Sequence, residues 1–325
     1  MEKTNILVTD PVHPEALERL TLAGFTITEL PEAERGRLAE FVEPYHALIC
    51  RTSTTVDRAV FERAAHLKCV AIASTGYDRI DVDEATRRGI AVLGLPPHNK
   101  DIDPEHDGNF VSTAEHAVLL MLAALDDLYS AAHSLKDNRW EKSYLVGTEL
   151  ADKTVGFFGF GRIAGLVAKR LAGFRVKLIA HDPYADKEKA RNHGVQLVSF
   201  DELCAQADII TIHAPRTKET EKSFNADAFS KMKDGIFLIN TARSAIIEEE
   251  ALIEALKSGK VKRAALDVFH DEPLGINRDL IALPNVIATP HIGGSTHEAW
   301  RRISLNAADN IIAYFAGETR NRINI

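Results

Sequence analysis

Residues 154–171 read TVGFFGFGRIAGLVAKRL and form the most informative pattern in the chain. A short apolar run from Thr154 to Phe158 meets two glycines, Gly159 and Gly161, after which apolar residues return at helical spacing. This pattern predicts a strand, a tight turn and a helix.

The two glycines suit the binding of a dinucleotide pyrophosphate. Gly159 permits the turn, and Gly161 lets the backbone approach phosphate without an intervening Cβ atom. The free N–H groups and the dipole of the new helix attract the anion. Ala164 takes the third position of the fingerprint, which needs only a small side chain. Because glycines end strands in many folds, an ordinary turn is the alternative interpretation of this motif alone.

A carboxylate at the end of the next strand supports the dinucleotide interpretation. The strand expected at 176–180 is followed by Asp182, 21 positions after Gly161. An acid at this spacing accepts hydrogen bonds from the adenosine ribose and repels a 2′-phosphate. NAD is therefore favoured over NADP.

The composition limits the other classes of function. The 325 residues have room for two domains, and the net charge of −8 is spread without a basic run, so nucleic acid is not an expected partner. There is no signal-like segment at the start and no apolar run that could span a bilayer, so we expect a cytoplasmic protein without a membrane partner. Cys50, Cys69 and Cys204 lack metal-ligand spacing, so we expect buried thiols and no metal site.

Strands and helices alternate on both sides of residues 96–108, a loop rich in prolines and acids. Such alternation predicts α/β architecture with two doubly wound parallel sheets. We expect a flavodoxin-like substrate domain at 1–105, completed by a returning helix at 297–325, and a Rossmann NAD-binding domain at 106–296. A largely buried helix is expected at 111–133, since apolar residues occupy several of its faces.

Polar residues follow three successive strands of the second half. Arg243 follows the strand at 236–239, Glu272 comes shortly after the strand at 263–266, and His291 follows the strand at 286–288. Since ligands bind at the carboxyl ends of parallel strands, these groups are expected to converge. Histidine suits proton transfer to a carbinol oxygen, a carboxylate orients it, and arginine grips a substrate carboxylate. The alternatives are an exposed Arg243, a solvated Glu272 and an ordinary turn histidine at 291.

At these residues the chain resembles the D-isomer-specific 2-hydroxyacid dehydrogenases, and the resemblance covers nearly the whole length. The matching blocks are 76–81, 88–90, 114–117, 155–165 with Asp182, 207–215, 232–235, 239–243, 265–269 and 283–293. The resemblance implies catalytic roles for Arg243, Glu272 and His291. It also implies that amides near Thr75 and Gly76 bind the substrate carboxylate, while Asp267 and the backbone of Thr241 hold the nicotinamide carboxamide. The cofactor-binding residues expected in all are Gly159, Gly161, Arg162, Ile163, Asp182, His213, Pro215, Thr241, Asp267 and Gly293.

The same resemblance implies a homodimer joined through the NAD-binding domains, with the helix near residues 115–128 at the interface. Glu272 argues against formate dehydrogenases, which carry glutamine there. Arg51 lies in a segment similar to the one in which an arginine of 3-phosphoglycerate dehydrogenases faces the substrate phosphate. The alternative is that Arg51 is a surface loop residue. Small 2-oxo acids such as glyoxylate, hydroxypyruvate or 3-phosphohydroxypyruvate are the candidate substrates.

Three departures from the family pattern stand out: Ser244 in place of a usual glycine, His270 in place of a common glutamate, and the longer acidic loop at 97–108. The loop is interpreted as a solvated insertion, with repulsion of phosphate, cation binding or a subunit contact as alternatives. Since the sequence ends at Ile325, we expect no carboxy-terminal regulatory domain. The rival to an enzyme is a non-catalytic NAD-sensing regulator of the same fold.

Overall fold

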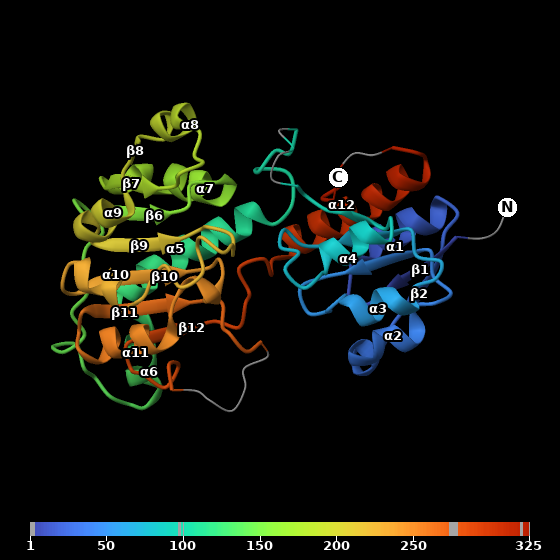
Figure 1. Cartoon of the computed structure of the whole chain (residues 1–325). Helices are drawn as coiled ribbons and strands as arrows, with labels where there is room; N and C mark the ends of the chain where they lie inside the picture. Colours follow the sequence, from blue (N-terminus) through green and yellow to red (C-terminus); the bar gives the residue numbers. More distant parts are fainter. Residues whose placement is uncertain (1–3, 97–98, 100, 273–278, 319–320, 325) are drawn as a thin grey trace. The chain divides into compact units, whose positions relative to one another are not determined.

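The computed structural model describes residues 4–96, 99, 101–272, 279–318 and 321–324. These group into a first unit, residues 1–110 with 294–325, and a second unit, residues 111–293. The elements of each unit are labelled in Figure 1.

The first unit is built on a five-stranded sheet in the order β2-β1-β3-β4-β5, and every strand pair is parallel. This is the flavodoxin-like order that was predicted. Its strands are β1 (Asn5–Val8), β2 (Thr26–Glu29), β3 (Ala47–Cys50), β4 (Cys69–Ile72) and β5 (Ala91–Leu93). Its helices are α1 (Pro14–Leu22), η1 (Glu32–Arg37), α2 (Leu38–Phe41), α3 (Arg58–Arg63), α4 (Val82–Arg87) and α12 (His297–Phe315).

Two apolar cores form on the two faces of this sheet. One contains residues of α2 and α3, and the other joins α1 to α12 through Ala16, Leu20, Ala307, Ala308 and Ile311. The hydroxyl of Thr296 caps α12 by accepting from the amide of Ala299 at 3.1 Å. The C-terminal helix therefore packs against α1 within the first unit.

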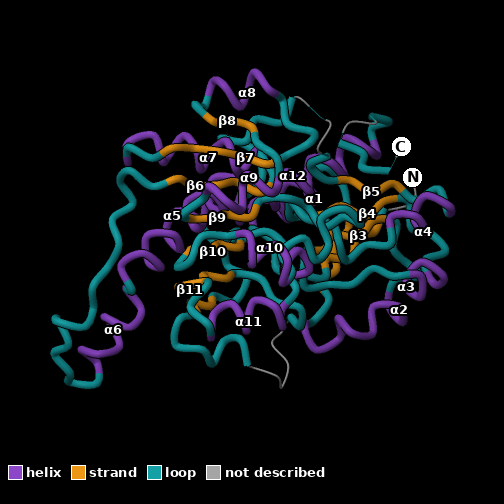
Figure 2. The backbone as a smooth tube through the Cα atoms, turned by 60° about the vertical axis from the view of Figure 1, so that its left-hand side comes forward, coloured by secondary structure: helices purple, strands orange, loops and turns teal. Residues whose placement is uncertain are grey.

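The second unit contains a seven-stranded parallel sheet in the order β12-β11-β10-β9-β6-β7-β8, with helices on both sides (Figures 1 and 2). Counted from β6, this is the strand order of a Rossmann fold with one strand added at an edge. Its strands are β6 (Thr154–Phe158), β7 (Lys177–His181), β8 (Val195–Leu197), β9 (Ile209–Ile212), β10 (Ile236–Asn240), β11 (Val261–Leu266) and β12 (Val286–Ala288). Its helices are α5 (Phe110–Asp126), α6 (Leu128–Lys136), α7 (Arg162–Leu171), η2 (Ala172–Phe174), α8 (Lys187–Asn192), α9 (Phe200–Gln206), α10 (Ala226–Lys231), η3 (Ser244–Ile246) and α11 (Glu249–Lys257).

The prediction of a single long helix at 111–133 is wrong. It breaks at Asp127, whose φ of 52° lies in the left-handed region, and α5 and α6 meet at 66°. Arg263 of β11 holds the break: its Nη1 donates to the carbonyl oxygen of Ala124 at 2.6 Å, and its Nη2 lies 2.7 Å from Oδ2 of Asp127.

The expected burial of this segment holds for one face only. Ala114, Ala117 and Met121 are fully buried, whereas Leu119 and Leu135 remain more than half exposed. In the described part of the chain no single helix is long and apolar enough to cross a bilayer, and α5 and α6 satisfy that test only together, across their bend.

All three cysteines are buried, as predicted. Burial raises the pKa of the Cys50 and Cys69 thiols, and it raises the pKa of Cys204 to about 11. The three side chains therefore act as apolar packing groups.

Candidate active site

The turn after β6 accepts only glycine at its first position. Gly159 has a φ of 88°, and a Cβ atom there would lie 2.6 Å from the backbone nitrogen of Ala214. Gly159 also donates its N–H to the carbonyl oxygen of His181 at 2.9 Å. The turn is thus pinned between β7 and the residues that follow β9.

Gly161 has a different role. A Cβ atom there would meet no atom within 4 Å, so packing inside the protein does not require glycine. Gly161 is the N-cap residue of α7 and has no side chain that could cap the first turn, in which Arg162 and Ile163 are partly exposed. Open space and uncapped N–H groups at a helix start fit the pyrophosphate of a dinucleotide.

Lys189 of α8 adds a positive group beside this turn, which sequence reasoning missed. Its Nζ lies 3.4 Å from the carbonyl oxygen of Gly161. Burial and the nearby charge of Arg162 lower the pKa of Lys189. Lys189 and Arg162 repel each other, and an anion bound between them would stabilise both charges.

Asp182 lies just after β7, partly buried, as its spacing predicted. Its Oδ2 accepts from the amide of Phe160 and its Oδ1 from the amide of Tyr184, each at 2.8 Å. The carboxylate therefore holds the glycine turn, and each oxygen keeps a lone pair for a ribose hydroxyl.

Three more expected cofactor residues lie after β9 and β10. His213 is partly buried, its Nε2 lies 2.9 Å from Oγ1 of Thr211, and burial lowers its pKa to about 3. Pro215 is exposed. Thr241 is buried, and its Oγ1 has no hydrogen-bond partner within the described part of the chain. A buried hydroxyl without a partner fits a polar ligand group at this place.

Glu272 and His291 lie in contact. Nδ1 of His291 is 2.7 Å from Oε2 of Glu272, and Oε1 of Glu272 accepts from the amide of Phe269 at 2.9 Å. Both side chains are about one-third exposed. His291 has a φ of 54°, which is uncommon for a residue other than glycine. The carboxylate is thus fixed by its own loop, and it orients the imidazole.

Arg243 follows β10 in a turn shaped by Asn240. The buried Asn240 amide donates to the carbonyl oxygen of Arg243 and its Oδ1 accepts from the amide of Ala242, both at 2.9 Å. Nη1 of Arg243 donates to the Ala242 carbonyl at 2.8 Å, and the side chain is partly exposed. Asn240 was not among the expected site residues, although its place at the end of a buried strand was a usable signal.

Asp267 is buried at the end of β11 and bonded to the segment that carries His291. Burial opposes its charge, but hydrogen bonds from the side chains of His116 and Thr289 and from the amides of Ile292 and Gly293 outweigh this effect and lower its pKa. Sequence reasoning missed His116 and Thr289.

The expected substrate residues Arg51, Thr75 and Gly76 belong to the first unit. Thr75 and Gly76 follow β4 and are partly buried, and the hydroxyl of Ser74 donates to the Gly76 carbonyl at 2.7 Å. The amide of Arg51 donates to Oδ2 of Asp10 at 2.8 Å. Burial lowers the pKa of the Arg51 guanidinium, and no group among the described residues accepts a hydrogen bond from it.

Asp10 is a buried carboxylate that shapes the loop after β3. It accepts from the hydroxyls of Ser53 and Thr54 as well as from the Arg51 amide. Burial opposes its charge, but these bonds and the charge of Arg35 lower its pKa. Asp10 was another residue that sequence reasoning missed.

The acidic loop at 97–108 lies partly outside the described residues. In its described part, Asp103 accepts from the amide of Glu105 and lies 2.8 Å from Nδ1 of His106, while Asp107 accepts from the amide of Asp103. The loop is joined to α12, because Arg302 donates to the carbonyl oxygen of Gly108. The carboxylates of Asp103 and Asp107 thus accept hydrogen bonds within the loop itself.

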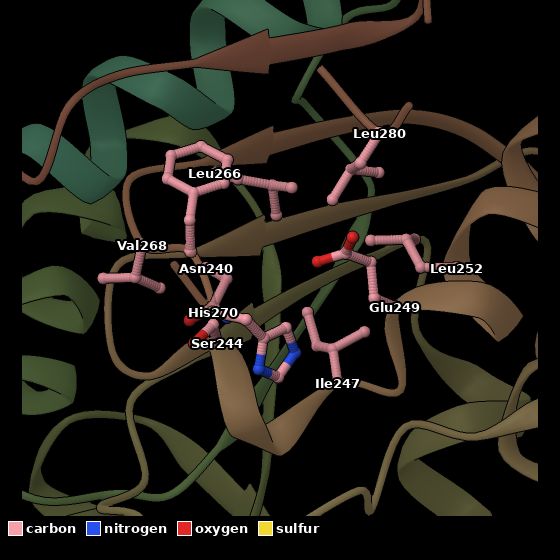
Figure 3. A pocket seen from close by; sticks show the side chains of 10 residues that line it. Asn240, Ser244, Ile247, Glu249, Leu252, Leu266, Val268, His270 and Leu280 are labelled. Carbon is pink, nitrogen blue, oxygen red and sulfur yellow. The ribbon is translucent and has the colours of Figure 1, made fainter. Parts of the chain in front are cut away.

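Two departures from the family pattern, Ser244 and His270, line one small pocket of the second unit (Figure 3). Its other walls are mostly apolar, and the carboxylate of Glu249 lies among them. Phe269, whose amide donates to Glu272, also lines it.

The glycine turn and Asp182 give the second unit the features of a dinucleotide-binding domain. Residues 118–293 match the family model described as D-isomer specific 2-hydroxyacid dehydrogenase, NAD binding domain. The chain belongs to this family, and the predicted family, fold class and NAD cofactor are confirmed.

Individual relatives are similar over the whole chain. D-3-phosphoglycerate dehydrogenase of Archaeoglobus fulgidus is 40% identical over 321 residues, which cover 98% of this chain and 59% of that protein. The chain thus spans little more than half the length of this relative. A glyoxylate reductase from Paecilomyes thermophila has a TM-score of 0.86 at 30% identity, and an NAD-dependent formate dehydrogenase from Staphylococcus aureus in complex with NAD has 0.85 at 30%, each covering 99% of both chains.

Proposed function

We propose that the protein is an NAD-dependent dehydrogenase that interconverts a small 2-oxo acid and its D-2-hydroxy acid. The contact between His291 and Glu272 carries this proposal. Because Nδ1 faces the carboxylate, the ring turns Nε2 away from it and toward a substrate oxygen. NAD, when bound, supplies or accepts the hydride.

The residues of this chain transfer the proton and stabilise the charge of the substrate. During reduction, Nε2 of His291 gives its proton to the former carbonyl oxygen, and Glu272 stabilises the imidazole while it is protonated. Arg243, held by Asn240, binds the substrate carboxylate and polarises the adjacent carbonyl. In the opposite direction His291 takes the hydroxyl proton.

We further propose that the substrate carries a phosphate on its third carbon, as in 3-phosphohydroxypyruvate. The support is Arg51, whose partly buried guanidinium has no acceptor among the described residues. A partly buried cation without a hydrogen-bond acceptor is unfavourable, and a phosphate dianion would supply a bidentate acceptor. The name of the Archaeoglobus fulgidus relative agrees with this choice.

The test is NADH oxidation with glyoxylate, hydroxypyruvate, pyruvate and 3-phosphohydroxypyruvate. We expect turnover of about 1 to 10³ per second with the preferred acid, and a higher kcat/KM for the phosphorylated acid than for hydroxypyruvate. NADH binding without turnover of any acid would instead favour the non-catalytic NAD-sensing regulator.

We also propose a homodimer joined through α5 and α6. Its support is a set of exposed apolar side chains on these helices: Leu119, Leu128, Tyr129 and Leu135, each 54–58% exposed. Such a concentration of exposed apolar side chains is typical of a surface that another protein covers. The cytoplasmic location expected from the sequence stays a prediction.

A further inference from the structure

His116 of α5 touches the segment that carries His291. Its side chain is 11% exposed, and its Nε2 lies 3.1 Å from Oγ1 of Thr289 and 3.3 Å from Oδ1 of Asp267. These residues are far apart in sequence, and all lie in the second unit.

The direction of the hydrogen bonds follows from the number of protons. Thr289 has one hydroxyl proton, and Oγ1 lies 2.6 Å from Oδ1 of Asp267, an ionised carboxylate that can only accept. The Thr289 hydroxyl therefore donates to Asp267, and its oxygen must accept from His116. This assigns a proton to Nε2 of His116.

Asp267 then fixes the backbone on the far side of His291. Its Oδ1 accepts from the amide of Ile292 at 2.8 Å, and its Oδ2 accepts from the amide of Gly293 at 2.7 Å. On the near side, the amide of Thr289 donates to the carbonyl oxygen of Leu266. His291 is therefore held in its left-handed conformation by bonds on both sides.

The packing at Gly293 leaves little room for adjustment. A Cβ atom there would lie 3.0 Å from Oδ2 of Asp267 and 3.6 Å from Cδ2 of His116. A change at His116 is therefore transmitted to the segment 289–293 and is not absorbed by empty space.

We infer that His116 is a positioning residue for His291, acting through Thr289 and Asp267. This inference rests on the proposed function, because positioning matters only if His291 transfers the proton. His116 does not itself exchange a proton with the substrate in this account. Its N–H group orients the hydroxyl of Thr289. This hydroxyl and the carboxylate of Asp267 hold the segment 289–293, and that segment positions the imidazole of His291.

The experiment compares His116→Phe, which removes the donor and keeps a ring, with His116→Gln, which keeps an N–H donor at similar reach. We expect His116→Phe to lower kcat about 10²-fold, as for a misplacement of about 1 Å in a catalytic group. The KM for the 2-oxo acid and the Kd for NADH should change less than kcat. His116→Gln should recover most of the lost kcat.

A second measurement needs no turnover. The ring signals of His291 in histidine-labelled protein, assigned by their loss in His291→Gln, should shift in His116→Phe and stay in place in His116→Gln. An unchanged kcat and unchanged His291 signals in His116→Phe would overturn the inference, as would equal losses in both variants with unmoved signals.

The proposed function can fail separately. If the wild-type protein turns over none of the 2-oxo acids, that proposal fails, and the His291 signals alone decide whether His116 positions the ring. Should His116→Phe fail to fold, Thr289→Val removes the same hydroxyl link and is assessed by the same two measurements.

Discussion

The Nδ1 atom of His291 lies 2.7 Å from Oε2 of Glu272, while the other oxygen of Glu272 is held by the amide of Phe269. The bond from Phe269 holds one carboxylate oxygen in place, so the other oxygen is directed at the imidazole. The pair is therefore oriented before any substrate arrives, which is the arrangement that proton transfer requires.

Removing either partner of this pair should impair catalysis more than binding. We expect His291→Gln to lower kcat by about 10²- to 10⁴-fold, because it removes the proposed proton carrier, and Glu272→Gln to lower it less. NADH binding, measured by fluorescence titration, should be retained in both. Near-normal turnover of His291→Gln would exclude the histidine from the mechanism.

Arg51→Ala should remove the preference for a phosphorylated substrate. A charge-assisted hydrogen bond contributes about 1.5–3 kcal/mol, so kcat/KM for 3-phosphohydroxypyruvate should fall about 10- to 100-fold. The value for hydroxypyruvate should hardly change. Arg58→Ala, which removes an exposed arginine paired with Glu62 in the same unit, is the matched control. Equal losses with both substrates would argue against phosphate recognition by Arg51.

Asp182→Ser should raise the use of NADPH relative to NADH. In the proposed cofactor site the carboxylate of Asp182 repels a 2′-phosphate, whereas serine does not. Because Asp182 also accepts from the amide of Phe160, we expect a weaker affinity for NADH as well. The ratio of kcat/KM for the two cofactors measures the effect, with Glu188→Ser on α8 as the control. An unchanged ratio would mean that the ribose is read elsewhere.

His213 should make the folded state less stable in mild acid. A histidine in the unfolded chain has a pKa near 6.5, whereas burial lowers the pKa of His213 to about 3 in the folded state. Between these values the unfolded state binds the extra proton, so the free energy of unfolding falls as the pH falls. The contribution is at most about 1.4 kcal/mol per pH unit.

Urea unfolding between pH 7 and 4.5 measures this contribution. The wild-type protein should lose stability more steeply than His213→Gln as the pH falls below 6.5. Parallel losses in the two proteins would show that His213 does not stay neutral in the fold.

Leu119→Glu should convert the proposed dimer into a monomer. A charge on an apolar face that becomes buried between subunits is strongly unfavourable. Sedimentation should show twice 35.8 kDa for the wild-type protein and 35.8 kDa for the variant. Leu22→Glu places the same change on an 82% exposed leucine of the first unit and should leave the mass unchanged. A monomeric wild-type protein would contradict the proposal.

Local patterns in the sequence predicted the fold of this protein. Strand and helix periodicity, together with the turn at Gly159 and Gly161, predicted two doubly wound parallel sheets. The strand pattern predicted that Asp182 would follow the second strand of its unit, and it lies directly after β7. These features depend on residues close in sequence, and the carboxyl ends of parallel strands necessarily meet at one edge of a sheet.

The break between α5 and α6 shows where such reasoning stops. The apolar periodicity runs through Asp127 without interruption, and neither glycine nor proline marks the break. Arg263, more than a hundred residues later, supplies the two bonds that hold it. Periodicity describes which helix faces are apolar. It does not show that a distant cation, here Arg263, stabilises the left-handed conformation of Asp127, which the chain would otherwise avoid.

The same distinction applies to the site. Strand ends are local features, so the residue pattern predicts that an arginine, a glutamate and a histidine follow neighbouring strands. The contact of Glu272 with His291, the bonds of Asp10 to the loop of Arg51, and the hold of His116 and Asp267 on the segment 289–293 arise from the packing of distant elements. Hydrogen bonds act over about 3 Å, so their partners are settled only when the packed elements bring distant residues within that distance.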